Sequence, residues 1–214
     1  MVPPSSFTLV LDFDGTVTQK DVGDEICERF APPEWRDIDA EWVRNEISLP
    51  EAQRRMWRLA RCGRDEAIGY SRAIGVERPG LAALLDGVRG AGGALWLASG
   101  GFDFYIEAIL DGRMARFERA FFNRARFIDG GVEVEFPHGD LACGRCAVCK
   151  GLVCDRARER GRVIFVGDGA SDRCAIGRAD VLCAVRGSML ERVCAERGVP
   201  CVPFDRLDEV LAAI

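Results

Sequence analysis

The chain alternates short apolar runs with longer stretches of helical periodicity. Four runs have the length and composition of buried strands, at residues 7–13, 94–98, 163–166 and 181–185. Each is followed by a turn and then by a segment of helical character. Repeated alternation of strand and helix predicts an α/β fold with a doubly wound parallel sheet. In such sheets ligands bind beyond the carboxyl ends of the strands, so the residues after each strand are the candidates for chemistry.

The interval between the first and second strands interrupts this alternation. About 80 residues without a convincing strand lie there, and their helical stretches include a capping box from Ser48 to Glu51. A crossover between parallel strands needs only about a dozen residues. We therefore expect a helical cap over residues 21–76, inserted into a core formed by residues 1–20 and 77–214. Residues 124–136 alternate about an Asp-Gly-Gly turn, which predicts a small β-hairpin.

The composition of the chain excludes several classes of function. The chain has 214 residues, is 48% hydrophobic and carries a net charge of −5, which suits one domain with an insertion and argues against a duplex nucleic-acid partner. The single histidine, His138, excludes a two-histidine zinc site. The N-terminus does not have the pattern of a signal peptide, and no run approaches the roughly 18 apolar residues of a membrane span. We expect a cytoplasmic monomer or homodimer with reduced thiols and no membrane partner.

Polar and charged residues follow the predicted strands. They are Asp12 and Asp14 after the first strand, Ser99 and Gly100 after the second, Asp168 and Asp172 after the third, and Lys150 at the start of the helix before the third. Lys150 is one of only two lysines among 29 basic residues. If the strands are parallel, these groups meet at one edge of the sheet. Each motif alone is weak, because an Asp-x-Asp pair can be a turn cap, and it is their combination that is specific.

The chemistry of this group points to phosphoryl transfer. Clustered carboxylates repel one another and need a cation to stay ionised, and Mg²⁺ suits an oxygen-only site that also takes a substrate phosphate. An aspartate beside a metal ion can attack phosphorus, and a second one can act as general acid and base. Ser99, the Gly100 amide and Lys150 would hold the phosphate oxygens.

The complete set resembles the haloacid dehalogenase superfamily of phosphohydrolases. Its first motif, DxDGTxT, is matched by residues 12–18, the second by Ser99, the third by Lys150 and the fourth by GDGASD at 167–172. The resemblance implies a Rossmann-like core with a helical cap, and hydrolysis of a small phosphorylated metabolite through an aspartyl-phosphate. It further implies that Asp12 is the nucleophile and Asp14 the acid and base. Mg²⁺ would then be held by Asp12, the Asp14 backbone carbonyl and Asp168, while Asp172 orients the metal shell or Lys150.

Further fragments narrow the resemblance. LASGGF and GDGASD resemble the phosphoserine-phosphatase-like branch, while FAPPEW (30–35), SGGFDFY (99–105), Asn123 and PH (137–138) are similar to the methionine-salvage phosphatases that act on 2-hydroxy-3-keto-5-methylthiopentenyl-1-phosphate. Phosphoserine, another small phosphoester and a phosphotransferase reaction remain alternatives. Within the candidate cleft, we expect Arg55 of the cap to contact a substrate oxygen, and Phe102 and Tyr105 to form part of an apolar wall.

Four cysteines form the densest thiol patch. The spacing of Cys143, Cys146, Cys149 and Cys154 permits a structural Zn²⁺ that holds the loop before Lys150. A loop with free thiols is the simpler interpretation, and a redox pair fits less well because no strand precedes it. A different class of function, a non-catalytic zinc or redox module binding a partner protein, also rests on this loop. The full set of catalytic residue types argues against that class.

Overall fold

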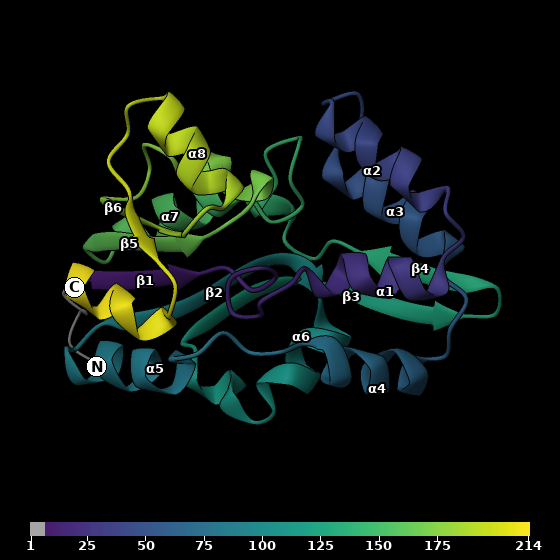
Figure 1. The fold of residues 1–214 in the computed structure, drawn as a ribbon, viewed down its shortest axis with the longest axis horizontal. Coiled ribbons are helices and arrows are strands. Elements are labelled where there is room, and N and C mark those ends of the chain that lie inside the picture. The colour runs from purple at the N-terminus through teal and green to yellow at the C-terminus, as the bar shows by residue number, and fades with distance from the viewer. Residues whose placement is uncertain (1–6) are drawn as a thin grey trace.

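A seven-stranded sheet forms the centre of the computed structural model, which describes residues 7–214 (Figure 1). Its strands are β1 (Phe7–Leu11), β2 (Ala94–Phe102), β3 (Arg119–Ile128), β4 (Gly131–Glu135), β5 (Arg162–Gly167), β6 (Val181–Val185) and β7 (Val202–Phe204). Their order across the sheet is β4-β3-β2-β1-β5-β6-β7. Every neighbouring pair is parallel except β3 and β4. This order places β1, which carries the first motif, between β2 and β5, which carry the second and fourth.

The central strands are buried on both faces. Along β1, Leu9 and Leu11 belong to one hydrophobic cluster and Val10, between them, to another. In β5, Ile164 and Phe165 are divided between the same two clusters. Because both faces are covered, these strands read as continuous apolar runs rather than as alternating ones. The predicted α/β fold with a doubly wound, mostly parallel sheet is confirmed.

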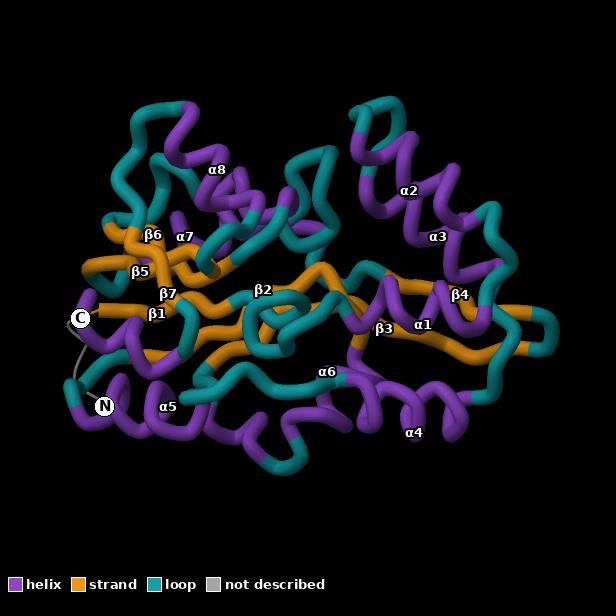
Figure 2. Tube along the Cα trace, in the orientation of Figure 1, coloured by secondary structure: helices purple, strands orange, loops and turns teal. Residues whose placement is uncertain are grey.

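Helices cover the two faces of the sheet (Figure 2). They are α1 (Val22–Phe30), α2 (Trp35–Val43), α3 (Leu49–Leu59), α4 (Arg64–Ile74), α5 (Leu81–Gly90), α6 (Asp103–Leu110), α7 (Lys150–Arg158) and α8 (Met189–Glu196), with short 3-10 segments η1 (Arg113–Arg116), η2 (Gly139–Leu141), η3 (Ala170–Ala175) and η4 (Leu207–Ala213). The buried side chains of α5 and α6 join the cluster that contains Leu9, whereas those of α7 and α8 join the cluster that contains Val10. Among the helices of residues 7–214, none combines the length and hydrophobicity needed to cross a bilayer.

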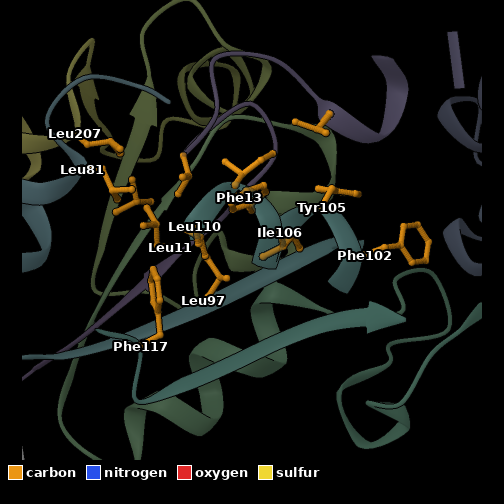
Figure 3. Close-up of a cluster of buried hydrophobic side chains, with 14 of the residues drawn as sticks. Leu11, Phe13, Leu81, Leu97, Phe102, Tyr105, Ile106, Leu110, Phe117 and Leu207 are labelled. Atoms are coloured by element: carbon orange, nitrogen blue, oxygen red, sulfur yellow. The ribbon is translucent and has the colours of Figure 1, made fainter. Parts of the chain in front are cut away.

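Helices α1–α4 occupy the interval in which the sequence predicts a helical insertion. They pack on the rest of the chain, because α3 contacts β4 and α4 contacts α6. Their buried side chains share one hydrophobic cluster with β1, β2, α5 and α6. Part of this cluster extends from Leu81 and Leu207 to Phe102 (Figure 3). A boundary between cap and core at residues 21 and 76 stays a prediction.

Three features of the sheet differ from the sequence-based expectation. First, β2 continues to Phe102 instead of ending at residue 98, and its pairing with β3 is irregular between Ala98 and Phe102. Ser99 and Gly100 therefore lie inside a distorted strand. Second, the predicted hairpin forms, but β3 also pairs in parallel with β2, so the hairpin extends the main sheet. Third, β7 is too short to show a strand pattern in the sequence.

Trp57 connects α3 to the sheet. Its side chain is buried, and its ring packs edge-to-face on Phe102 at 4.8 Å and on Phe104 at 5.8 Å between ring centroids. Aromatic pairs of this geometry stabilise a structure beyond their buried area. Trp57 therefore holds the inserted helices against the end of β2.

We expect Trp57→Ala to lower the free energy of unfolding by about 3–5 kcal/mol, because it leaves a cavity between α3 and the sheet. Denaturant unfolding followed by circular dichroism measures the change. Trp42→Ala is the control, since Trp42 is only partly buried and its removal should cost clearly less. Equal losses for the two variants would contradict the role given to Trp57.

Candidate active site

A cleft of about 290 Å³ lies where the carboxyl ends of β1, β2 and β5 face α1, α2 and α3. Seven residues predicted from the sequence line it: Asp12, Asp14, Ser99, Gly100, Phe102, Lys150 and Asp168. Asp172 is fully buried directly behind them. Strand ends that are separated by up to 156 residues in the chain thus meet at one edge of the sheet, as parallel pairing requires.

Lys150 is the cationic centre of this group. It is the first residue of α7, and its side chain is only 2% exposed. Its Nζ lies 3.2 Å from Asp12 Oδ1 and 3.0 Å from Asp172 Oδ1, and it donates a hydrogen bond to Ser171 Oγ at 2.6 Å. Burial by itself would lower the pKa of Lys150, but the two carboxylates outweigh it and raise that pKa. The ammonium group therefore stays charged.

Asp172 organises the loop after β5. Its Oδ2 accepts hydrogen bonds from the backbone N–H groups of Asp168, at 2.9 Å, and Gly169, at 2.8 Å. The neighbouring Asp168 Oδ1 accepts from Thr16 Oγ1 at 2.8 Å. Gly15 comes so close that a Cβ there would overlap the Asp168 carboxylate, and its φ of +71° also favours glycine. The loops after β1 and β5 are thereby held against each other.

Three carboxylates come close enough to share a cation. One oxygen each from Asp12, Asp168 and Asp172 lies within 4.8 Å of the others. Burial and then repulsion from Asp172 raise the pKa of Asp12 well above its usual value, and the same two causes raise that of Asp168 to about 7. A divalent cation would offset both effects. Because every donor is oxygen, the group fits Mg²⁺.

The Asp14 carboxylate has different neighbours. Its Oδ2 accepts hydrogen bonds from the Tyr105 hydroxyl at 2.8 Å and from Ser99 Oγ at 3.4 Å, and its Oδ1 accepts from the Val22 N–H at 3.1 Å. Burial and then repulsion from Asp21 raise the pKa of Asp14 to about 8. At neutral pH this carboxyl group can therefore hold a proton, as a general acid must. From the sequence we expected Tyr105 to form an apolar wall, so its hydrogen bond to Asp14 was missed.

Polar side chains fix the loop that contains Ser99. Ser99 Oγ accepts a hydrogen bond from the Gly101 N–H at 2.9 Å. The Gly100 carbonyl accepts from Gln53 at 2.8 Å and from Asn123 at 2.7 Å. Gln53 belongs to α3, so this bond ties the inserted helices to the candidate phosphate site. The sequence feature that could have predicted this hydrogen bond is the polar residue Gln53, which lies four positions before Trp57 and therefore on the same, buried face of α3.

The structure places Arg55 outside the cleft. Its guanidinium group forms an ion pair with Glu41 of α2, and its side chain is 40% exposed. Arg55 does not line the cleft. It is two residues from both Gln53 and Trp57, and two residues are about 200° of rotation in a helix. Because those two side chains face the sheet, Arg55 faces away from it. Phe102 lines the cleft.

The structure also places Cys154 outside the group of neighbouring thiols. The sulfur atoms of Cys143, Cys146 and Cys149 lie close to that of Cys174, whereas Cys154 is not part of the group. Cys154 is fully buried in the hydrophobic cluster between α7 and the sheet. The ten cysteines all lie within residues 7–214, and no disulfide joins any of them there. Cys174 lies 25 residues beyond Cys149, so only the packing of η3 on α7 brings it close.

The rest of the cleft has an acidic wall and an apolar wall. The acidic residues are Asp21, Asp24 and Asp39, and the apolar ones include Leu49, Met56 and Trp57. Repulsion from the neighbouring Asp21 raises the pKa of Asp24 above its usual value. Among the described residues that line the cleft, Lys150 is the only cationic side chain.

The chain is similar in sequence to a known protein family and to several phosphatases. Residues 9–176 match the family of haloacid dehalogenase-like hydrolases. A 2-hydroxy-3-keto-5-methylthiopentenyl-1-phosphate phosphatase from Bacillus velezensis is 31% identical over 211 residues, which cover 96% of this chain and 88% of that protein. The phosphatase of the same name from Geobacillus kaustophilus is 31% identical over 210 residues, which cover 96% and 94%.

Solved structures agree with this assignment at the level of the fold. A phosphoserine phosphatase with an analogue of the phospho-aspartyl intermediate superposes with a TM-score of 0.74 at 22% identity, covering 98% of this chain and 99% of that one. A substrate-bound phosphoserine phosphatase gives a TM-score of 0.72 at 21% identity. The family match spans most of the chain and includes all four motifs. The chain therefore belongs to the haloacid dehalogenase-like hydrolases and is a phosphomonoester hydrolase.

Proposed function

We propose that this hydrolase removes the phosphate group of 2-hydroxy-3-keto-5-methylthiopentenyl-1-phosphate in methionine salvage. The observation that carries the proposal is the 31% identity, over 96% of this chain, to each of two phosphatases of that name. Both matches cover nearly the whole length of those relatives, so the cleft-forming helices are included.

The walls of the cleft suit such a substrate. A methylthio group is apolar and polarisable, and it would lie against Met56, Trp57 and Phe102. The hydroxyl group of the substrate would donate a hydrogen bond to a carboxylate oxygen of Asp24 or Asp39. The phosphate would lie at the other end, beside Ser99 and Lys150.

Phosphoserine fits the same cleft less well. Its carboxylate would need a cationic partner, and the one cation among the described lining residues, Lys150, is already paired with Asp12 and Asp172. The other end of the cleft presents Asp21, Asp24 and Asp39, which would repel a carboxylate. The likeness to phosphoserine phosphatases therefore supports a shared fold and not a shared substrate.

The first half of the reaction forms an aspartyl-phosphate. A carboxylate oxygen of Asp12 attacks phosphorus, the new O–P bond forms, and the bond from phosphorus to the substrate oxygen breaks. Asp14 gives its proton to the leaving oxygen. Ser99, the Gly100 amide and Lys150 hold the phosphate oxygens on which charge accumulates. Mg²⁺ held by Asp12, the Asp14 backbone carbonyl and Asp168 would supply the positive charge that lets these carboxylates and the phosphate approach one another.

The second half of the reaction releases phosphate. Asp14, now ionised, takes a proton from a water molecule as that water attacks phosphorus, and the bond to Asp12 breaks. Tyr105 holds the Asp14 carboxylate in position through both halves. The hydrogen bond from Gln53 to the Gly100 carbonyl keeps α3 over the phosphate site and limits the entry of other water. Water as the acceptor makes the reaction a hydrolysis rather than a phosphotransfer.

Asp12→Asn should reduce kcat at least about 10,000-fold, because an amide is a poor nucleophile at phosphorus. Release of inorganic phosphate in the presence of Mg²⁺ measures the change. Asp86→Asn, at an exposed carboxylate on α5, is the control and should keep wild-type activity. EDTA should abolish wild-type turnover and excess Mg²⁺ should restore it. Mg²⁺-dependent turnover by Asp12→Asn would rule out this nucleophile.

Tyr105→Phe should lower kcat about 10- to 100-fold with little change in KM, because it removes one hydrogen bond of about 1.5–3 kcal/mol to the Asp14 carboxylate and leaves the phosphate contacts intact. Steady-state kinetics separates the two parameters. The chain has one other tyrosine, Tyr70, which packs on Phe30 away from the cleft. Tyr70→Phe is therefore a matched control. A rise in KM at constant kcat would contradict the role given to Tyr105.

Substrate choice is tested by direct comparison. We expect kcat/KM for 2-hydroxy-3-keto-5-methylthiopentenyl-1-phosphate to exceed that for phosphoserine at least about 100-fold, or about 2.7 kcal/mol of transition-state binding. Both substrates are assayed at the same Mg²⁺ concentration by phosphate release. Equal or better use of phosphoserine would overturn the substrate assignment while leaving the aspartate chemistry intact.

A further inference from the structure

A cluster of four thiols lies close to the active site but outside the catalytic scheme. Cys143, Cys146 and Cys149 belong to the loop before α7, and Cys174 belongs to η3. Their Sγ atoms all lie within 4.8 Å of one another. Cys146 and Cys149 are buried, Cys174 is half-buried and Cys143 is exposed.

The spacing of the sulfur atoms matches a shared metal ion. In a tetrahedral site with Zn–S bonds of about 2.3 Å, neighbouring sulfur atoms are about 3.8 Å apart. Sulfur atoms within 4.8 Å of one another reach that geometry by shifts of about 1 Å or less. A disulfide would instead require one pair to close to about 2.0 Å and would leave the other two thiols unused. Four sulfur ligands in a tetrahedral arrangement are typical of zinc.

The electrostatics of the cluster favour a thiolate, which is the form that binds metal. Cys149 is the N-cap residue of α7, where the positive end of the helix dipole stabilises negative charge. The cluster thus has one sulfur atom at a helix N-terminus and three further sulfur atoms beside it.

We propose that Cys143, Cys146, Cys149 and Cys174 bind one structural zinc ion. The ion joins two segments that carry catalytic motifs, because Cys149 directly precedes Lys150 and Cys174 is two residues after Asp172. These segments already touch: a Cβ on Gly151 would overlap the Cys174 backbone. Zinc therefore sets the distance between the Lys150 ammonium and the Asp172 carboxylate by linking the backbones that carry them.

The same loop also contacts the inserted helices. The Arg145 carbonyl accepts a hydrogen bond from the Leu49 N–H at 2.9 Å. The Arg145 guanidinium donates to the backbone carbonyl of Asn45 at 3.2 Å and to the Asn45 side chain. Arg145 lies between two of the proposed ligands, Cys143 and Cys146. A metal ion that holds this loop therefore also supports the helices that form the opposite wall of the cleft.

Metal content tests the proposal on the full-length protein, purified without chelators or an immobilised-metal column. We expect one zinc ion per chain by inductively coupled plasma mass spectrometry. Cys174→Ala should lose most of this zinc on dialysis against a mild chelator. Cys154→Ala is the matched control, because it removes a buried thiol from the same helix as Lys150, and it should keep its zinc.

Cobalt substitution locates the metal. Wild-type protein loaded with one equivalent of Co²⁺ should show the intense visible bands of a tetrahedral site and a thiolate-to-cobalt charge-transfer band in the near ultraviolet. Asp168→Asn should keep this spectrum, since Asp168 belongs to the oxygen site, and Cys174→Ala should lose it. The wild-type stoichiometry and spectrum are decisive even if a cysteine variant does not fold.

Several results would overturn the zinc proposal. They are a folded wild-type protein that binds no zinc when one equivalent is offered, iron in place of zinc, a disulfide among the four cysteines, or a cobalt spectrum without charge transfer from sulfur. Loss of zinc from Cys154→Ala but not from Cys174→Ala would overturn the assigned ligands. None of these results bears on the proposed phosphatase reaction, which is measured separately.

Discussion

Repulsion among carboxylates buried at one end of the sheet is the constraint around which the site is arranged. Asp12, Asp168 and Asp172 bring three negative charges within a few ångströms of one another, in surroundings that raise the pKa values of Asp12 and Asp168. Lys150 offsets part of this charge from the side of α7. A divalent cation would offset the remaining negative charge and so allow a substrate phosphate to bind beside the carboxylates. Stability and chemistry therefore depend on the same electrostatic balance.

The sheet and helices α1–α3 form different parts of the cleft. The strand ends carry the groups that face the phosphate, and they come together because parallel strands end at one edge. Helices α1–α3 provide the acidic and apolar walls at the other end. Trp57 and Gln53, four residues apart on α3, attach these walls to the sheet by packing and by a hydrogen bond. Substrate selectivity can thus vary in the helices while the aspartate chemistry stays the same.

The proposed zinc site complements the magnesium site in chemistry and in position. One group of ligands is entirely oxygen and the other entirely sulfur, so the two ions do not compete for the same ligands. The sulfur group lies in the two segments that position Lys150 and Asp172. On this proposal, the cysteines act on catalysis only through the placement of backbone, which explains why so many thiols occur next to a site that uses none of them.

The sequence by itself determined the four central strands, the mostly parallel sheet and the identity of the motif residues, because apolar runs and short motif spacings are local properties of the chain. It did not determine which residues of α1–α3 line the cleft, which cysteine completes the cluster, or that Tyr105 bonds to Asp14. Gln53 lines the cleft and Arg55 does not, because they lie on different faces of α3. Cys174 joins the thiol cluster and Cys154 does not, because of the way η3 packs on α7. These contacts join residues far apart in sequence or depend on the rotation of a helix. Tertiary packing decides such contacts, and no local sequence pattern predicts them.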